Sequence, residues 1–141
     1  MQNLPASIQR FFPPFEGGLD GLTPPWEGAQ AAAEAVIARL GGLRVGSTAP
    51  GVEQAQSNIE FHEALRQDRE VVVQPWRMLL GDLVSVADAH HGHIMLFVDA
   101  EGRYYAFTDP DSKLYSLGEF QQAMEKLLLG LEFGSPLEPG R

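Results

Sequence analysis

The alternation of apolar and polar positions in the second half of the chain predicts a meander of short strands. Between positions 93 and 98, apolar side chains fall on both alternating faces, which is typical of a strand at the centre of a sheet. The Asp-Ala-Glu-Gly sequence at 99–102 supplies a hairpin turn in which Gly102 takes a positive φ. The predicted order continues with an aromatic return strand over 103–108, a turn at 109–112 and a short strand over 114–117.

After Gly118 the apolar period changes from two to 3.6, which predicts a helix. Glu119 lies at its positive N-terminal end, Lys126 lies near its C-terminal end, and Gly130 is placed to cap it. The stripe expected to face the sheet consists of the apolar residues on one side of this helix: Phe120, Ala123, Met124, Leu127 and Leu128.

The first half of the chain predicts another helix and further short strands. An alanine-rich run over 27–40 is helical and ends at two glycines. Ile59 and Phe61 alternate with polar residues, which predicts an edge strand. The remaining expectations are a strand start at 43–45, a mobile surface loop at 46–57, helix-compatible sequence at 62–69, extended structure at 71–73, and a helix over 76–80 begun by Pro75.

Together these elements predict an α+β fold, with a mostly antiparallel sheet of about five to six strands, a meander in the C-terminal half, and helices packed against the sheet. The single domain is expected over 27–130, followed by a C-terminal tail at 131–141. Residues 1–26 mix aromatic residues with prolines and glycines, and are too apolar for a solvated tail. We interpret them as an N-terminal packing segment with a short helix over 7–12; an arm that contacts a partner is the alternative.

Composition narrows the possible functions. The 141 residues are 44% hydrophobic, which suffices for one domain with its own core. The chain has no cysteine and no apolar run long enough for a signal peptide or a membrane helix, so we expect a cytoplasmic protein. The formal charge of −9 disfavours nucleic acid and anionic membranes as partners, and it favours a basic protein.

His90-His91-Gly92-His93 is the most conspicuous cluster of possible metal ligands. If a strand begins at His91, the side chains of His91 and His93 project from one face and share a metal with Asp88, as in a small metal-dependent hydrolase. The alternative is a polar turn before a buried strand. We favour the turn, because metal sites usually draw ligands from separated elements and the only other histidine is His62.

Two pairs of carboxylates, Asp99 with Glu101 and Asp109 with Asp111, fall in predicted turns. Turns select aspartate for its local backbone hydrogen bonds. Acid-base catalysis would need a carboxyl group in an apolar pocket with a raised pKa, and a turn tip does not provide one. The chain also lacks a G-x-S-x-G nucleophile motif and a phosphate-binding loop. The sequence therefore favours a binding protein over an enzyme.

Four segments stand in a definite order along the chain. They are Leu-Gly-Gly-Leu-Arg-Val at 40–45, Asn-Ile-Glu-Phe at 58–61, the hairpin at 99–102 with its tyrosine-bearing strand, and Leu-Gly at 117–118 followed by the amphipathic helix. Over roughly residues 27–130 this order resembles the third subgroup of the SUKH superfamily, bacterial immunity proteins related in fold to the Smi1/Knr4 group. Ser85 and Ala87 stand where a proline and a glycine are expected.

The resemblance implies an SUKH-like fold and an immunity protein that binds a cognate toxin domain and occludes its active site. A toxin that acts on nucleic acid, such as a deaminase or a nuclease, presents a basic groove and so fits the acidic charge. An intracellular adaptor or chaperone for a secreted protein and the metal-dependent hydrolase remain alternatives. The interpretation includes no cofactor, metal or catalytic residue. The predicted toxin-binding residues lie at one end of the meander: Asp88, His90, His91, His93, Asp109 and Asp111.

Overall fold

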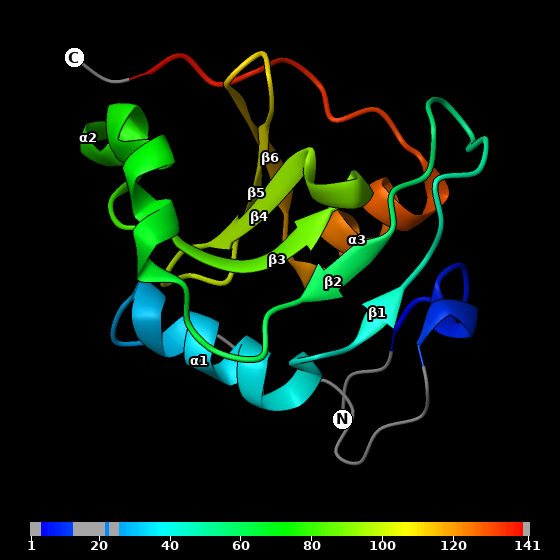
Figure 1. The fold of residues 1–141 in the computed structure, drawn as a ribbon, viewed down its shortest axis with the longest axis horizontal. Helices are drawn as coiled ribbons and strands as arrows, with labels where there is room; N and C mark the ends of the chain where they lie inside the picture. Colours follow the sequence, from blue (N-terminus) through cyan, green and yellow to red (C-terminus); the bar gives the residue numbers. More distant parts are fainter. Residues whose placement is uncertain (1–3, 13–21, 23–25, 140–141) are drawn as a thin grey trace.

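The computed structural model describes residues 4–12, 22 and 26–139, and these are built around one six-stranded antiparallel sheet (Figure 1). The strands lie side by side in sequence order, so the meander runs through the whole sheet and not only through its C-terminal half. The α+β class is confirmed. The strands are β1 (Arg44–Val45), β2 (Ile59–Phe61), β3 (Val84–Ala89), β4 (Ile94–Val98), β5 (Tyr104–Thr108) and β6 (Lys113–Gly118).

The helices cover the two faces of the sheet unequally. Helix α1 (Ala29–Leu40) packs on β3 and β4, and α3 (Phe120–Leu129) packs on β5 and β6 from the same side. The other face is covered by the 3-10 helix η3 (Gln67–Trp76), which continues into the short helix α2 (Arg77–Leu80) at the left of Figure 1. The described residues also form the shorter 3-10 helices η1 (Gln9–Phe11) and η4 (His90–Gly92).

Alternation along the central strands builds a hydrophobic core on each face. In β5, Tyr104 and Ala106 point into the core beneath α1 and α3, whereas Tyr105 and Phe107 point into the core beneath η3. All four side chains are buried. The expected central position of the 93–98 strand is therefore confirmed, since burial on both faces is possible only between neighbouring strands and two covering layers.

Helix α3 follows the predicted pattern closely. Its five predicted core residues are buried, and Gly130 ends it in the left-handed conformation. Glu119 is the N-cap and forms a capping box with Gln122, which satisfies backbone N–H groups that would otherwise lack partners. Gly102 likewise has the predicted positive φ, at 79°.

The loop at 46–57 lies at the surface, as predicted, but its backbone is anchored to the C-terminal end of α3. The backbone N–H groups of Val52 and Ser57 donate to the carbonyls of Leu129 and Leu127, at 2.9 and 2.7 Å. Those of Glu53 and Gln54 both donate to the carbonyl of Gly130. The loop thus satisfies carbonyl groups that the end of a helix leaves without partners.

Three local predictions are wrong in whole or in part. Residues 71–73 are not extended but belong to η3, because Val73 and Trp76 lie one 3-10 turn apart and are both buried beneath this segment. The β2 strand is not an edge strand, because it pairs with β1 and β3. Its alternation arises because one face of β2 is buried and the other is open. Residues 62–66 are not helical.

A β-bulge interrupts the pairing of β3 with β4 between Ser85 and Ala87. These are the two positions at which the resemblance led us to expect a proline and a glycine. Both residue types suit an irregular strand, because proline lacks a backbone donor and glycine tolerates a bulge. The irregularity is therefore formed here without the residues that usually mark it.

Both ends of the domain are folded back onto it where the structure describes them. Within residues 1–26, Ile8, Phe12 and Leu22 are buried in the core on the α1 side, and the predicted short helix is η1; residues 1–3, 13–21 and 23–25 lie outside the described part. The tail after α3 crosses to the opposite face (Figure 1). There the Trp76 indole N–H donates to the carbonyl of Leu137 at 2.8 Å.

Replacing Leu127 by alanine should lower the free energy of unfolding by about 2–5 kcal/mol, because the side chain is completely buried between α3 and the sheet. Chemical denaturation measures this loss. Leu129→Ala, on the half-buried side of the same helix, is the matched control and should cost less. Equal losses in the two variants would contradict the assigned helix face.

Gly130→Ala should destabilise the protein by more than the roughly 1–2 kcal/mol that a left-handed conformation costs a non-glycine residue. A Cβ at this position would overlap the Gln54 carbonyl oxygen and lie 2.9 Å from the Cα of Gly51. Gly134→Ala is the control, since its φ is also positive, at 89°, but no atom lies within 4 Å of the added Cβ. If thermal denaturation shows the same loss in both variants, the anchored loop does not constrain α3.

Candidate functional site

The structure brings the β3–β4 and β5–β6 connections together at one end of the sheet. The backbone N–H of Asp109 donates to the carbonyl of His93 at 2.9 Å, which fixes the two connections side by side. His91, His93, Asp109 and Asp111 are all exposed there. We call these four residues the sheet-end surface.

The histidine cluster does not form the predicted metal site. The strand begins at Ile94, and η4 turns the backbone before it, so His91 and His93 do not alternate along a strand. The Nδ1 atom of His90 lies 3.2 Å from the Ser57 hydroxyl, and the Nε2 atom of His91 lies 3.3 Å from that of Thr48. Within residues 4–12, 22 and 26–139, no three His, Cys, Asp or Glu side chains are placed to hold a metal ion.

Asp88 is not at a loop tip, as its place in the sequence suggested, but inside β3 on the face covered by η3. Its carboxylate accepts two hydrogen bonds from the Arg69 guanidinium, at 2.5 and 3.2 Å. The two side chains are only 26% and 17% exposed. The bond to Asp88 raises the pKa of Arg69. This bidentate pair joins the start of η3 to the middle of the sheet.

The acidic residues of the β4–β5 hairpin, at the opposite end, are also engaged. Asp99 is buried, and it accepts hydrogen bonds from the backbone N–H of Glu101 and of Arg103 and from the Tyr105 hydroxyl. Burial, with a smaller contribution from Asp99, raises the pKa of Tyr105 to about 12. Glu101 pairs with Arg103 at 3.2 Å. The Asp99 carboxylate is therefore occupied by hydrogen bonds that stabilise the hairpin.

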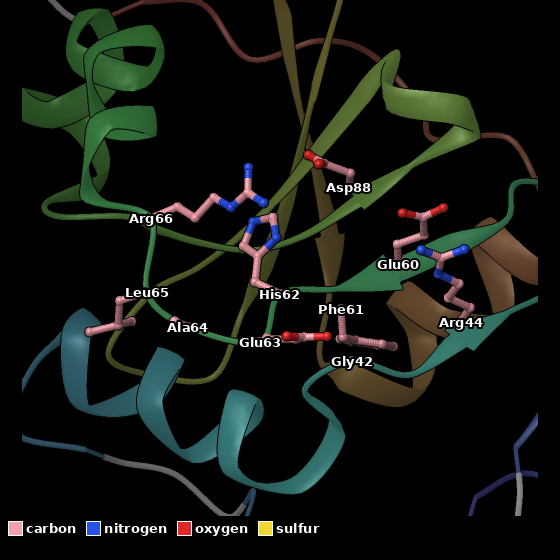
Figure 2. Close-up of a pocket in the computed structure, with 10 residues that line it drawn as sticks. All are labelled: Gly42, Arg44, Glu60, Phe61, His62, Glu63, Ala64, Leu65, Arg66 and Asp88. Atoms are coloured by element: carbon pink, nitrogen blue, oxygen red, sulfur yellow. The ribbon is translucent and has the colours of Figure 1, made fainter.

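A groove runs over β2 and β3 between η3 and the β3–β4 connection (Figure 2). It consists of two adjoining hollows, each of about 320 Å³, which share Glu60 and Asp88. One hollow extends toward Arg66 and the other toward His91. The full lining is Gly42, Arg44, Asn58, Glu60, Phe61, His62, Glu63, Ala64, Leu65, Arg66, Asp88, His91 and Gly92.

The groove exists because the cover on this face is incomplete. Paired positions form a row across all six strands: Arg44, Glu60, Asp88, Met95, Phe107 and Leu114. The last two side chains are buried beneath η3, α2 and the C-terminal tail. The first two are exposed. The charged half of the row is thus the open floor of the groove.

His62 lies at the groove but is only 5% exposed, and its Nε2 atom is 2.8 Å from the Ser85 hydroxyl. Burial lowers the pKa of His62, although Asp88 nearby acts in the opposite direction. Because Ser85 is completely buried, its hydroxyl is not accessible to a substrate in the groove. This pair therefore has a structural role. The sequence alone did not indicate this role, because His62 stands there as a single histidine.

With the fold and the groove established, comparison with protein families identifies the chain. The model of the SUKH-3 immunity protein family matches residues 25–130. The chain belongs to the SUKH-3 immunity protein family. The SUKH-like fold predicted from the sequence is thereby confirmed, and the function is immunity through binding of a cognate toxin protein. Immunity proteins are in general not enzymes.

Searches of curated proteins and of solved structures gave no significant match to this immunity protein. Within the described residues, no helix combines the length and the apolar character needed to cross a membrane.

The stability of this immunity protein should fall as the pH is lowered from about 7.5 to about 5.5. The folded state disfavours protonation of His62, whereas the unfolded chain takes up a proton near pH 6.5. The stabilisation is therefore complete above about pH 6.5 and is lost as the pH falls through that value toward the folded pKa. His62→Gln should reduce the slope, as measured by urea denaturation at each pH.

A glutamine at this position keeps a polar partner for Ser85 but does not titrate, and the charged groups that surround His62 (Arg66, Asp68, Arg69 and Asp88) are the same in both proteins. Identical pH slopes for the parent and for His62→Gln would show that His62 does not carry the effect.

Proposed function

We propose that this immunity protein neutralises a toxin that acts on nucleic acid, a deaminase or a nuclease, by covering the toxin's basic active-site cleft with the sheet-end surface. The proposal rests chiefly on the exposed carboxylates of Asp109 and Asp111 in a chain of net charge −9. Neither residue takes part in an ion pair within the described residues. A cleft built to hold phosphate groups would attract such carboxylates as substrate mimics.

Backbone strain at the same end supports the proposal. Within the described part of the chain, three non-glycine residues have a positive φ, and all lie in these two connections: His90 at 50°, His91 at 54° and Ser112 at 56°. Holding a non-glycine residue at a positive φ costs of order 1–2 kcal/mol relative to glycine. Sparsely populated backbone conformations cluster at functional sites, so their grouping here favours a role for these side chains in binding.

The other predicted contact residues have a supporting role in this proposal. Asp88 is engaged by Arg69, and His90 lies within hydrogen-bond distance of Ser57. Asp88 and His90 hold the neighbouring backbone in place through these contacts, whereas His91 and His93 contact the toxin together with the two aspartates. The metal-dependent hydrolase has no corresponding support, because the described residues form no metal-binding group.

Asp109→Asn combined with Asp111→Asn should slow association with the toxin at low salt, by up to about tenfold, and reduce the dependence of the rate on salt. We expect the cognate toxin domain at the C-terminus of the protein encoded immediately upstream. Its catalytically inactive form is the probe, and stopped-flow mixing measures the rate. Asparagine in place of Asp111 still accepts the hydrogen bond from Thr108, so folding should be retained.

The matched control is Glu27→Gln combined with Glu34→Gln, which changes the net charge equally at exposed positions at and near α1, the helix on the other face of the sheet. The proposal requires that the sheet-end substitutions slow association with the toxin more than this control does. Equal effects would mean that the toxin responds only to total charge. Inhibition of the active upstream domain on DNA or RNA tests the assigned toxin class separately.

A further inference from the structure

Large apolar side chains are exposed mainly on one segment of the molecule. Within the described residues, Val71, Met78 and Leu79 of η3 and α2 and Val52 of the 46–57 loop have the most exposed large apolar side chains. Met78 is 84% exposed and Leu79 is 58% exposed. Scattered single residues of this kind are ordinary on protein surfaces, but several on one short segment indicate an interaction site.

Met78 and Leu79 follow Pro75 at helical spacings of three and four residues, so both lie beside Pro75 on the surface of this segment. All three are exposed. We call them the apolar knob. It marks the end of the η3–α2 segment, which closes at Gly81.

The knob stands on a rigid base. Trp76, between two of its members, is buried and packs edge-on against Phe107, with ring centroids 6.1 Å apart. Its indole N–H is bound to the carbonyl of Leu137. The knob is therefore held in place before a partner arrives, which reduces the entropy lost on binding.

Polar side chains lie on the same segment as the knob. A small hollow of about 20 Å³, which no residue of the knob lines, is lined in part by Glu70, Gln74, Arg77 and Asp82. Arg77 and Asp82 form an exposed ion pair at 3.0 Å. Methionine and arginine, which this segment carries at Met78 and Arg77, are enriched at protein–protein interfaces.

We propose that the apolar knob is the anchor by which the cognate toxin docks, and that the toxin presents an apolar pocket to it. This inference rests on the proposed toxin-neutralising function. The surface of three side chains is far smaller than the roughly 800 Å² per partner that a stable interface buries. The partner must therefore also cover neighbouring surface. The open groove supplies this surface. Its wall at Leu65 and Arg66 (Figure 2) leads directly into η3, whose continuation carries the knob. Its far hollow reaches His91 of the sheet-end surface.

The two parts of the interface make different kinetic contributions. Exposed carboxylates act mainly on the association rate through long-range attraction. A buried apolar anchor acts mainly on the dissociation rate, and its contribution is almost independent of salt. The anchor can therefore be tested separately from the acidic surface.

Met78→Gln combined with Leu79→Gln should accelerate dissociation of the inactive upstream C-terminal domain by at least about tenfold, while the association rate and its salt dependence stay close to those of the parent. Glutamine is close to methionine in length and is a good helix former, so α2 should persist. Val52→Gln is the matched control, because Val52 is 73% exposed but lies in the 46–57 loop. Surface plasmon resonance measures both rates.

The outcomes separate this inference from the proposed function. If the parent binds and the double variant dissociates no faster than Val52→Gln, the knob is not the anchor, and the proposed function stands. If the parent does not bind the domain at all, the inference and the proposed function both fail. If sedimentation shows that the free parent is a dimer and the double variant a monomer, the knob joins two copies of this chain and the inference is wrong.

Discussion

The structure depends on one constraint, which is that the central strands must be buried on both faces. Alternate residues of β4 and β5 are apolar in both directions, so an uncovered face would expose Phe97, Tyr105 and Phe107 to water. On one side two full helices meet this need. On the other side, among the residues that the structure describes, the cover consists of η3, α2 and the C-terminal tail. This cover reaches the half of the sheet that is apolar and leaves β1 and β2 open.

The position of the cover is fixed electrostatically where its apolar contacts end. Arg69 binds Asp88 on the third strand, at the border between the apolar and charged halves of the sheet. An ion pair as sheltered as this one would be costly to break from one side only, because the remaining charge would lose its partner. The pair therefore defines the wall of the groove, and the same carboxylate forms part of the groove floor.

Regions where local alternation decides burial could be predicted from the sequence. The core stripe of α3, its cap at Gly130 and the strands of the C-terminal meander follow from periodicity and turn chemistry. Residues 71–73 could not be assigned in this way, since valine favours strands locally but burial of Val73 and Trp76 at a spacing of three stabilises a 3-10 helix. Tertiary packing outweighed intrinsic propensity there.

The candidate site was less predictable, because its geometry depends on partners distant in sequence. Asp88 looks like a turn residue until the fold brings Arg69 to it. Similarly, alternation in β2 indicates one open face, but periodicity alone does not distinguish an edge strand from an inner strand whose cover is missing. The sequence did not indicate the left-handed backbone of His90 and His91, since a positive φ is uncommon in any non-glycine residue, even in histidine, where it is enriched.

Unequal cover also separates stability from recognition. The core beneath α1 and α3 joins all six strands to both long helices, and it holds most of the buried apolar side chains. Apart from the sheltered Asp88, the groove floor, the sheet-end surface and the apolar knob consist of exposed side chains outside that core. Substitutions at exposed positions usually change the free energy of unfolding by less than about 0.5 kcal/mol. An immunity protein built in this way can match the surface of a particular toxin through residues that the fold does not need, while the covered face keeps the sheet intact.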